Sequence, residues 1–223
     1  MDLLDFGLRP LSDHLPKETY SAVCENATRR VFSDGQALHA RGDVGVRLSM
    51  IASGAARLGR YQQDGSFQLV AMLGPGGHFG DISMQRSAYT HDGYAVGNTE
   101  TFVIGEALLE QFLRELPGFA LALWRCNTSR LNALLELYDD ARALSVPQRL
   151  AKVIYVHSGK GERPDGVACL QKDFAAILGV TEVSIGTALK ELEKLGLIKT
   201  GYRFVSVPNK ARLKSWLRKS GIS

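Results

Sequence analysis

The stretch that decides the fold is QKDFAAILGVTEVSIGTALKELEKL, residues 171–195, followed directly by the tripeptide GLI. Apolar residues recur within it at the three- and four-residue spacing of one helix face, in two separate groups. The two groups are Phe174, Ile177 and Leu178, then Ile185, Leu189 and Leu192. This pattern predicts two short helices that bury their apolar faces against each other and against the rest of a domain.

The residues between the two groups predict a tight turn. Gly179 can end the first helix in the left-handed conformation, which is costly for other residues. Thr181 then offers a hydroxyl to cap the next helix. Two short helices joined by such a turn form a helix-turn-helix, whose second helix enters the DNA major groove. A plain helical hairpin inside a core is the alternative; Ala175, Gly179 and Ile185 at the first, fifth and eleventh places of one frame favour DNA binding.

The charge distribution agrees with a nucleic-acid partner for the C-terminal part. Residues 1–144 carry 13 Lys and Arg against 17 Asp and Glu, whereas residues 145–223 carry 14 against 6, a net charge of +8. A basic segment that coincides with a helix-turn-helix indicates a polyanionic partner, and we expect double-stranded DNA.

The rest of the chain divides into helical and β-type stretches. Residues 1–27 predict a short helical lead-in, and residues 28–104 alternate apolar and polar residues between Gly-bearing turns such as 63–66. Many short strands of this kind predict a small antiparallel sandwich or jelly roll. Further along we expect helices over 107–116, 118–144, 148–157 and 209–219, a short strand over 167–170, and a two-stranded wing over 198–207.

We therefore expect an α+β protein with three parts. These are an antiparallel β jelly-roll sensor domain (1–116), a long dimerisation helix (117–144) and a winged helix-turn-helix domain (145–223).

The long helix carries two apolar faces, which require two packing partners. One face follows a seven-residue repeat that Asn127 and Arg130 interrupt. The other face is a second apolar stripe. The predicted dimer seam is Leu123, Leu134, Leu137, Ala141 and Leu144, and the second face is Leu121, Trp124, Leu131, Leu135 and Tyr138. Packing one face on the jelly roll and the other on a second copy predicts a homodimer; a helix within a monomeric core is the alternative.

The order of jelly roll, long helix and winged helix-turn-helix resembles the Crp/Fnr superfamily of bacterial transcription regulators. The likeness rests on residues 171–198 and on LGPGGHFGD, residues 73–81, which is similar to that family's Gly-x-x-Phe-Gly-Glu turn. The resemblance implies a homodimer on a two-fold-related DNA site, an effector pocket in the jelly roll and RNA polymerase as a partner.

The implied effector pocket departs from that of cyclic-AMP-binding members. It falls on Gly80, Asp81, Ile82, Ser83, His91, Asp92, Leu134 and Leu135. Asp81 replaces the Glu that holds the ribose, and His91 and Asp92 stand roughly where an Arg-Ser/Thr-Ala triplet clamps the phosphate. Leu134 and Leu135 replace a hydroxyl pair that contacts adenine, which would leave polar groups of the base unpaired. We therefore expect a regulator that does not respond to cyclic AMP.

Cysteine and histidine residues bear on other possible cofactors and activities. Cys24, Cys126 and Cys169 are widely spaced without a C-x-x-C pair, so we expect no iron–sulfur cluster or structural zinc. His78 and His91 are available to haem, and the identity of any small-molecule effector stays open. A cupin-like metalloenzyme with an accessory helix-turn-helix would need clustered metal ligands, and no His-x-His occurs. A redox switch would use Cys126.

The N-terminal residues and the length of the apolar runs indicate whether the protein is secreted or inserted into a membrane. Residues 1–11 carry acids where a secretory signal requires basic residues, and no apolar run reaches membrane-spanning length. We expect a cytoplasmic protein without membrane contact.

Outward positions of the second helix predict how DNA is read. Glu182 can accept from cytosine N4, and Val183 and the Thr187 methyl can contact thymine methyls. Because no Arg lies on this face, we expect a site different from the family's common TGTGA and TTGAT half-sites. The predicted DNA-binding residues are Gln171, Lys172, Thr181, Glu182, Val183, Ser184, Thr187, Lys190, Tyr202 and Arg203, with Lys210 as a further phosphate contact.

Overall fold

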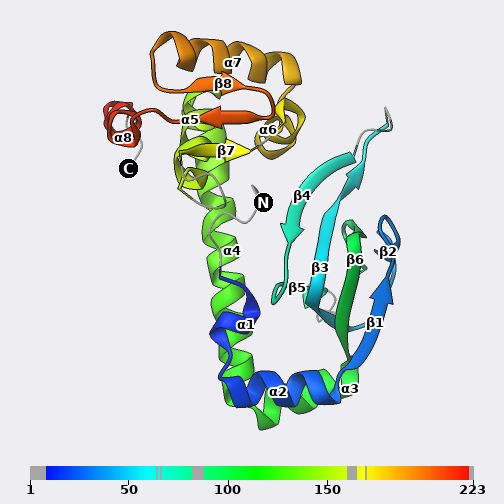
Figure 1. The fold of residues 1–223 in the computed structure, drawn as a ribbon. Helices are drawn as coiled ribbons and strands as arrows, with labels where there is room; N and C mark the ends of the chain where they lie inside the picture. The colour runs from blue at the N-terminus through cyan, green and yellow to red at the C-terminus, as the bar shows by residue number, and fades with distance from the viewer. Residues whose placement is uncertain are drawn as a thin grey trace. The chain divides into compact units, whose positions relative to one another are not determined.

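The computed structural model describes residues 9–63, 65, 67–81, 88–159, 165–168 and 170–220. The chain divides into two compact units, one of residues 2–132 and the other of Ala133–Ser223, and the division falls inside one long helix, α4 (Pro117–Ala143). Figure 1 shows the elements of each unit along the chain. No helix in the described ranges has both the length and the apolar composition that crossing a membrane requires.

The first unit is built on antiparallel strands, as the alternating pattern predicts. β6 is central, because it pairs with β1, β2 and β3, while β3 pairs in turn with β4 and β5. The predicted turn at 63–66 lies between β3 and β4; Gly65 has a positive φ of 80°, and Asp64 and Ser66 lie outside the described residues. The strands are β1 (Thr28–Phe32), β2 (Ala37–His39), β3 (Arg47–Tyr61), β4 (Phe67–Leu73), β5 (His78–Phe79) and β6 (Asp92–Gly105).

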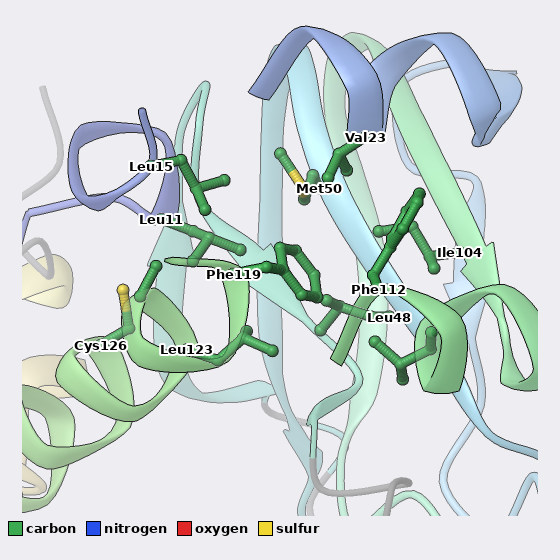
Figure 2. Close-up of a cluster of buried hydrophobic side chains, with 12 residues drawn as sticks. Leu11, Leu15, Val23, Leu48, Met50, Ile104, Phe112, Phe119, Leu123 and Cys126 are labelled. Carbon is green, nitrogen blue, oxygen red and sulfur yellow. The ribbon is translucent and has the colours of Figure 1, made fainter. Parts of the chain in front are cut away.

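Helices from both ends of the unit share one core with these strands (Figure 2). They are α1 (Leu11–His14), α2 (Lys17–Asn26), α3 (Glu106–Glu115) and the first part of α4. Phe119 of α4 is fully buried and meets the ring of Phe112 edge-on at 5.7 Å between centroids. Such aromatic pairs contribute about 0.5–1.5 kcal/mol beyond the area that they bury.

Two residues of α4 lie in this core, and the first of them contradicts the predicted dimer seam. Leu123 is buried beside Leu11 and Phe119 of its own chain, so it is not on an exposed dimer seam and that prediction is wrong for it. Cys126 is also buried there, and burial raises the pKa of its thiol. A buried thiol with a raised pKa is poorly reactive, which argues against the redox switch.

The second unit contains the remaining helices and a small sheet. Its helices are α5 (Val146–His157), α6 (Gln171–Leu178), α7 (Glu182–Lys194) and α8 (Lys210–Lys219). Its strands β7 (Gly166–Ala168), β8 (Lys199–Gly201) and β9 (Phe204–Ser206) form an antiparallel sheet in the order β7-β9-β8. Pro147 lies in the first turn of α5, as predicted, and the Gln148 side chain accepts from the Ser145 amide at 2.8 Å.

Candidate nucleic-acid interface and effector domain

The turn between α6 and α7 has the predicted geometry. Gly179 adopts φ 63° and ψ 40°, the left-handed conformation that ends α6. The hydroxyl of Thr181 accepts from the Ser184 amide at 3.1 Å and so caps α7. Arg149 of α5 donates to the carbonyl of Leu178, the last residue of α6, at 3.1 Å. This contact could not be predicted from a local pattern, because the two residues lie 29 positions apart.

One side of α7 is buried and the other is open. Ile185, Leu189 and Leu192 are buried, as their spacing predicts. On the opposite side Val183 is 79% exposed, and Glu182 and Lys190 are exposed as well. An apolar side chain with that exposure at the first turn of a helix is available for contact with another molecule.

The hydroxyl groups of this face are partly engaged. Thr187 is exposed and donates its hydroxyl to the Val183 carbonyl at 3.1 Å, one turn back. Ser184 is only half exposed, and its hydroxyl lies 2.9 Å from that of Thr181. The side chains that α7 presents most openly at its start are therefore Glu182, Val183 and Thr187.

The wing presents two further predicted residues. Tyr202 is 92% exposed, and Arg203 beside it adopts a positive φ of 53° in the turn between β8 and β9. An Arg in this conformation holds a tight two-residue turn at a cost in backbone strain. The wing thus places an aromatic hydroxyl and a guanidinium at its tip.

Glu193, which the sequence analysis did not single out, links α7 to the wing. Its carboxylate accepts from the Thr200 amide at 2.8 Å and from the Thr200 hydroxyl at 3.0 Å. These hydrogen bonds lower the pKa of Glu193. The contact fixes the start of β8 against the end of α7, so the wing and the exposed face of α7 are held as one surface.

The residues predicted to contact phosphate differ in whether their side chains are already engaged within the protein. Gln171 and Lys172 are exposed at the start of α6, and Lys172 and Lys190 have no ion-pair partner among the described residues. The ammonium of Lys210, in contrast, donates to the Ser158 carbonyl and lies 5.1 Å from the centroid of the Tyr155 ring. Lys210 therefore joins α8 to α5, and the prediction of a phosphate role is not supported for it.

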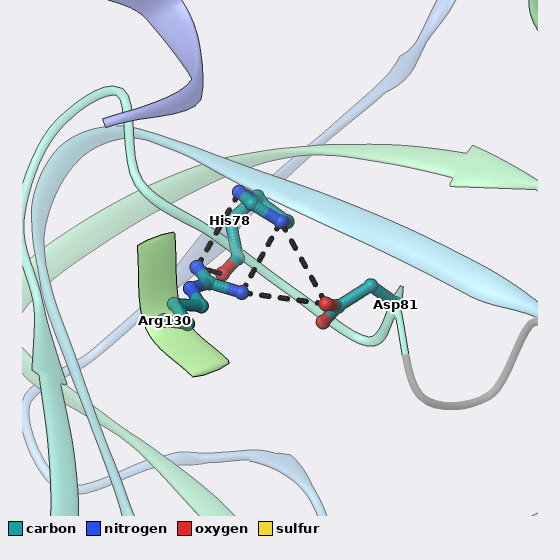
Figure 3. Close-up of polar contacts among 3 residues, drawn as sticks. All are labelled: His78, Asp81 and Arg130. Atoms are coloured by element: carbon teal, nitrogen blue, oxygen red, sulfur yellow. Dashed lines mark hydrogen bonds and ion pairs between the residues drawn. The ribbon is translucent and has the colours of Figure 1, made fainter. Parts of the chain in front are cut away.

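In the first unit, the Phe-Gly-acid turn is tied to α4 by a three-residue cluster (Figure 3). Arg130 donates to the His78 carbonyl at 2.7 Å and lies 3.4 Å from Asp81 Oδ2. Its Nη1 lies 3.2 Å from Nε2 of the His78 ring. Burial, and then the nearby guanidinium, lower the pKa of His78 well below its ordinary value, so the ring is neutral and one nitrogen can accept from Arg130.

This cluster changes the interpretation of two predicted residues. The Asp81 carboxylate is engaged by Arg130, which the sequence analysis had treated only as an interruption of an apolar seam. Gly80, which directly precedes Asp81, is buried and has a φ of +92°. A Cβ at this position would lie 2.2 Å from the Arg47 carbonyl oxygen, so only Gly fits.

The other predicted effector residues are not gathered into one described pocket. His91 bonds to the Thr90 hydroxyl at 2.9 Å, and Asp92 accepts from the amide of Arg41, in the loop after β2, at 2.8 Å, so both side chains are engaged within the sheet domain. Leu134 and Leu135 are exposed and belong to the second compact unit. The predicted residues Ile82 and Ser83 lie outside the described residues.

The expectation about the phosphate clamp also needs a correction. Arg86, Ser87 and Ala88 do have the order Arg-Ser-Ala of the family triplet, five residues before His91. Arg86 and Ser87 lie outside the described residues, and Ala88 is exposed. Placing His91 and Asp92 at the phosphate clamp is therefore wrong, and the residues that still differ from those of cyclic-AMP-binding members are Asp81, Leu134 and Leu135.

The arrangement of potential metal ligands bears on the metalloenzyme and haem alternatives. Over the described ranges, no group of three or more His, Cys, Asp or Glu side chains could hold a metal ion. His78, one of the two candidate haem ligands, is buried and contacts Arg130.

The exposed apolar face of α4 is the one that the sequence analysis took as the second face. Its members are separated alternately by three and four residues, with Thr128 completing the series, which is the seam spacing of a coiled coil. Trp124 is 70% exposed, the highest fraction among them. The exposed members are Leu121, Trp124, Leu131, Leu135 and Tyr138. Leu137 and Leu144 are half-buried, and Ala141 is exposed.

Comparison with known proteins agrees with this organisation. Residues 29–115 match the model of the cyclic nucleotide-binding domain, and residues 148–216 match the Crp-like helix-turn-helix domain. The cyclic AMP receptor protein of Thermus thermophilus is 28% identical over 92% of this chain and 95% of its own. The nitrogen fixation regulation protein FixK of Rhizobium meliloti is 26% identical over 75% of this chain and 76% of its own.

Solved structures share the fold. CprK in complex with OCPA superposes with a TM-score of 0.75 at 18% identity and covers 91% of this chain and 94% of its own. The fold and the two matched domains define a transcription regulator with a cyclic nucleotide-binding-type domain and a DNA-binding helix-turn-helix. The chain belongs to the Crp/Fnr superfamily.

Proposed function

We propose that the protein is a homodimeric, sequence-specific DNA-binding regulator that reads a two-fold-related site with one α7 helix in each half-site. The exposed face of α7, beside an exposed wing, is the observation that carries this proposal. Glu182, Val183 and Thr187 are exposed in the first two turns of α7, and the N-terminal residues of a recognition helix are the ones that reach base edges. Lys172, Lys190 and Arg203 supply positive charge for the phosphates.

The dimer is supported by α4. Its exposed apolar face has coiled-coil spacing, and a row of large apolar side chains of this kind is stabilised by packing against an identical row. A two-fold pair of helices would also bring two recognition helices to successive major grooves, which requires half-sites about one helical turn apart, roughly 34–36 Å.

We further propose that cyclic AMP is not the effector. The Asp81 carboxylate is paired with Arg130, and the side chains at 134 and 135 are apolar. RNA polymerase as a partner, and a cytoplasmic location, follow from the family and belong to the same proposal.

A selection from random duplex DNA with the purified full-length protein tests the proposal. The expected result is enrichment of one two-fold-symmetric sequence whose half-sites are neither TGTGA nor TTGAT. Recovery of either of those half-sites would overturn the specificity proposed for α7, and the absence of any enriched sequence would overturn sequence-specific binding itself.

A further inference from the structure

Two residues, Tyr202 and Arg203, form the tip of the wing between β8 and β9. Tyr202 is 92% exposed, the highest fraction among the large apolar and aromatic side chains of the described residues. Neither side chain has a hydrogen bond or an ion pair with another described residue. The aromatic ring and the guanidinium are therefore both available to a partner outside the chain.

Arg203 adopts a backbone conformation that its side chain disfavours. Within the described part of the chain it is the one residue other than Gly with a positive φ. Gly would adopt this conformation without strain, so an Arg at this point of the turn stabilises the fold less than Gly would. Strained residues of this kind cluster at functional sites. The strain therefore indicates that the guanidinium contributes to binding rather than to folding.

The base of the wing holds this tip beside α7 (Figure 1). The amide of Thr200, two residues before Tyr202, donates to the Glu193 carboxylate of α7 at 2.8 Å. Thr200 also pairs with Val205 of β9, which is buried and pairs on its other side with Val167 of β7. Because both strands of the wing are held, its tip loses little conformational freedom when it binds, which favours its use as a binding element.

The geometry of B-DNA limits what such a tip can meet. When α7 lies in the major groove, the neighbouring groove is the minor groove, whose centre lies roughly half of a 34–36 Å helical turn away. The minor groove is about 6 Å wide, so it admits side chains at the tip of a hairpin but not the hairpin itself. Its negative potential is strongest where A·T pairs make it narrow, and this potential attracts Arg.

We propose that the wing tip enters the minor groove beside each half-site. The Tyr202 ring packs there on the sugars of the groove wall, and the Arg203 guanidinium lies between the two rows of phosphates. This inference rests on the proposed function, since it requires α7 in the major groove. It adds a preference for A·T pairs outside the bases that α7 reads, because their minor groove is narrow and lacks the amino group of guanine. A Tyr202 hydroxyl bonded to a phosphate would give no such preference.

Base-pair substitutions beside the half-sites test this inference with the full-length protein. The duplexes keep the selected half-sites and carry A·T, G·C or inosine·C at each position within roughly one helical turn, about 10 base pairs, of them. Inosine lacks the guanine amino group, so inosine·C resembles A·T in the minor groove and G·C in the major groove. Fluorescence anisotropy should show that A·T and inosine·C bind about fivefold more tightly than G·C at the position of the wing.

The same titrations distinguish failure of this inference from failure of the proposed function. Equal affinities for all flanks, or an inosine·C duplex that behaves like G·C, would overturn the inference and leave the proposed function standing. A protein that does not discriminate among bases within the half-sites would overturn the proposed function and this inference together.

Variants of Tyr202 separate the ring from the hydroxyl. Tyr202→Phe keeps the ring and should keep the preference for A·T flanks, whereas Tyr202→Ser keeps a hydroxyl and should lose it. Tyr61→Ser, which removes an exposed Tyr from β3, is the control and should leave the preference unchanged. Equal loss in Y202F and Y202S would assign the contact to the hydroxyl and overturn the inference.

A variant of Arg203 separates binding from folding. Because Gly tolerates a positive φ, Arg203→Gly should raise the midpoint of urea unfolding, yet it should weaken DNA binding by about fivefold. An Arg203 with a purely structural role would not change the two measurements in opposite directions. An R203G protein that binds DNA as tightly as wild type would overturn the role of Arg203 in the inference.

Discussion

Arg130 of α4 donates to the main-chain carbonyl of His78 at 2.7 Å and reaches Asp81 with the same guanidinium. The long helix is therefore fastened to the turn at which the family's effector pocket is formed. Because His78 itself is buried, the carbonyl and the ring have no access to water as a substitute partner.

Replacing Arg130 by Met should remove this fastening. We expect the free energy of unfolding to fall by about 1–3 kcal/mol, the usual effect of losing a hydrogen bond from a charged group. Urea denaturation measures the change, with Arg125→Met, an exposed residue of the same helix, as the control. The pKa of His78 should rise in R130M but stay below its ordinary value, because burial, the larger cause, persists. Equal stabilities of the two variants would contradict the structural role of Arg130.

The glycines of the helix-turn-helix offer a matched pair. Gly179→Ala places a side chain at φ 63° and should cost about 1–2 kcal/mol. Gly186→Ala lies inside α7, where the added Cβ would meet only the Gln171 side chain at an ordinary 3.5 Å, and should stabilise by about 0.5–1 kcal/mol. Thermal or urea unfolding of the two variants should give opposite signs.

Attachment of the wing should depend on pH through Glu193. Because its pKa is lower in the folded protein than in the unfolded chain, the carboxylate stabilises the fold above the ordinary value of 4.5, and this contribution is lost as the pH falls below it. Hydrogen exchange of the Thr200 amide should accelerate over that range beyond its intrinsic pH dependence. In Glu193→Ala the amide should exchange near its intrinsic, unprotected rate at every pH. Unchanged protection in E193A would show that the hydrogen bond does not hold the wing.

The oligomeric state tests the exposed face of α4. Leu131→Lys places a charge in the middle of the apolar row and should convert the dimer to monomer, as measured by analytical ultracentrifugation. Asn132→Lys adds the same charge at an exposed neighbouring position off that row and should leave the dimer intact. A wild-type monomer at micromolar concentration, or a dimeric L131K, would contradict the proposed seam.

Calorimetric titration tests the effector proposal. We expect no heat of binding when cyclic AMP is added to the full-length protein, because Asp81 is engaged and the residues at 134 and 135 offer no hydroxyl. Saturable binding that Arg86→Ala abolishes would instead assign the Arg-Ser-Ala triplet its family role.

Local signals explain why the helix-turn-helix was predictable. Gly179 and Thr181 act on their immediate neighbours, and the buried positions of α7 follow from spacing alone, so residues 171–195 contain almost all that their conformation requires. The wing and the antiparallel strands were likewise predictable from turn residues and alternation.

What the sequence could not decide were choices made by distant residues. Both apolar faces of α4 fit a seam, and only the burial of Leu123 and Cys126 beside Leu11 shows which face packs within the chain. Arg130 and His78 lie 52 positions apart, and Arg149 and Leu178 lie 29 positions apart. No periodic pattern records such pairings.

The central claim, that the exposed face of α7 reads bases, is tested most directly by comparing wild type with Val183→Ala and Lys190→Ala on every single-base variant of the selected site. The account predicts that V183A loses discrimination at one symmetric position in each half-site. It predicts that K190A weakens binding to all sequences alike and reduces the salt dependence by about one phosphate contact, a slope change of roughly 0.9. A V183A protein that weakens uniformly on all sequences, or keeps full discrimination, would contradict the account.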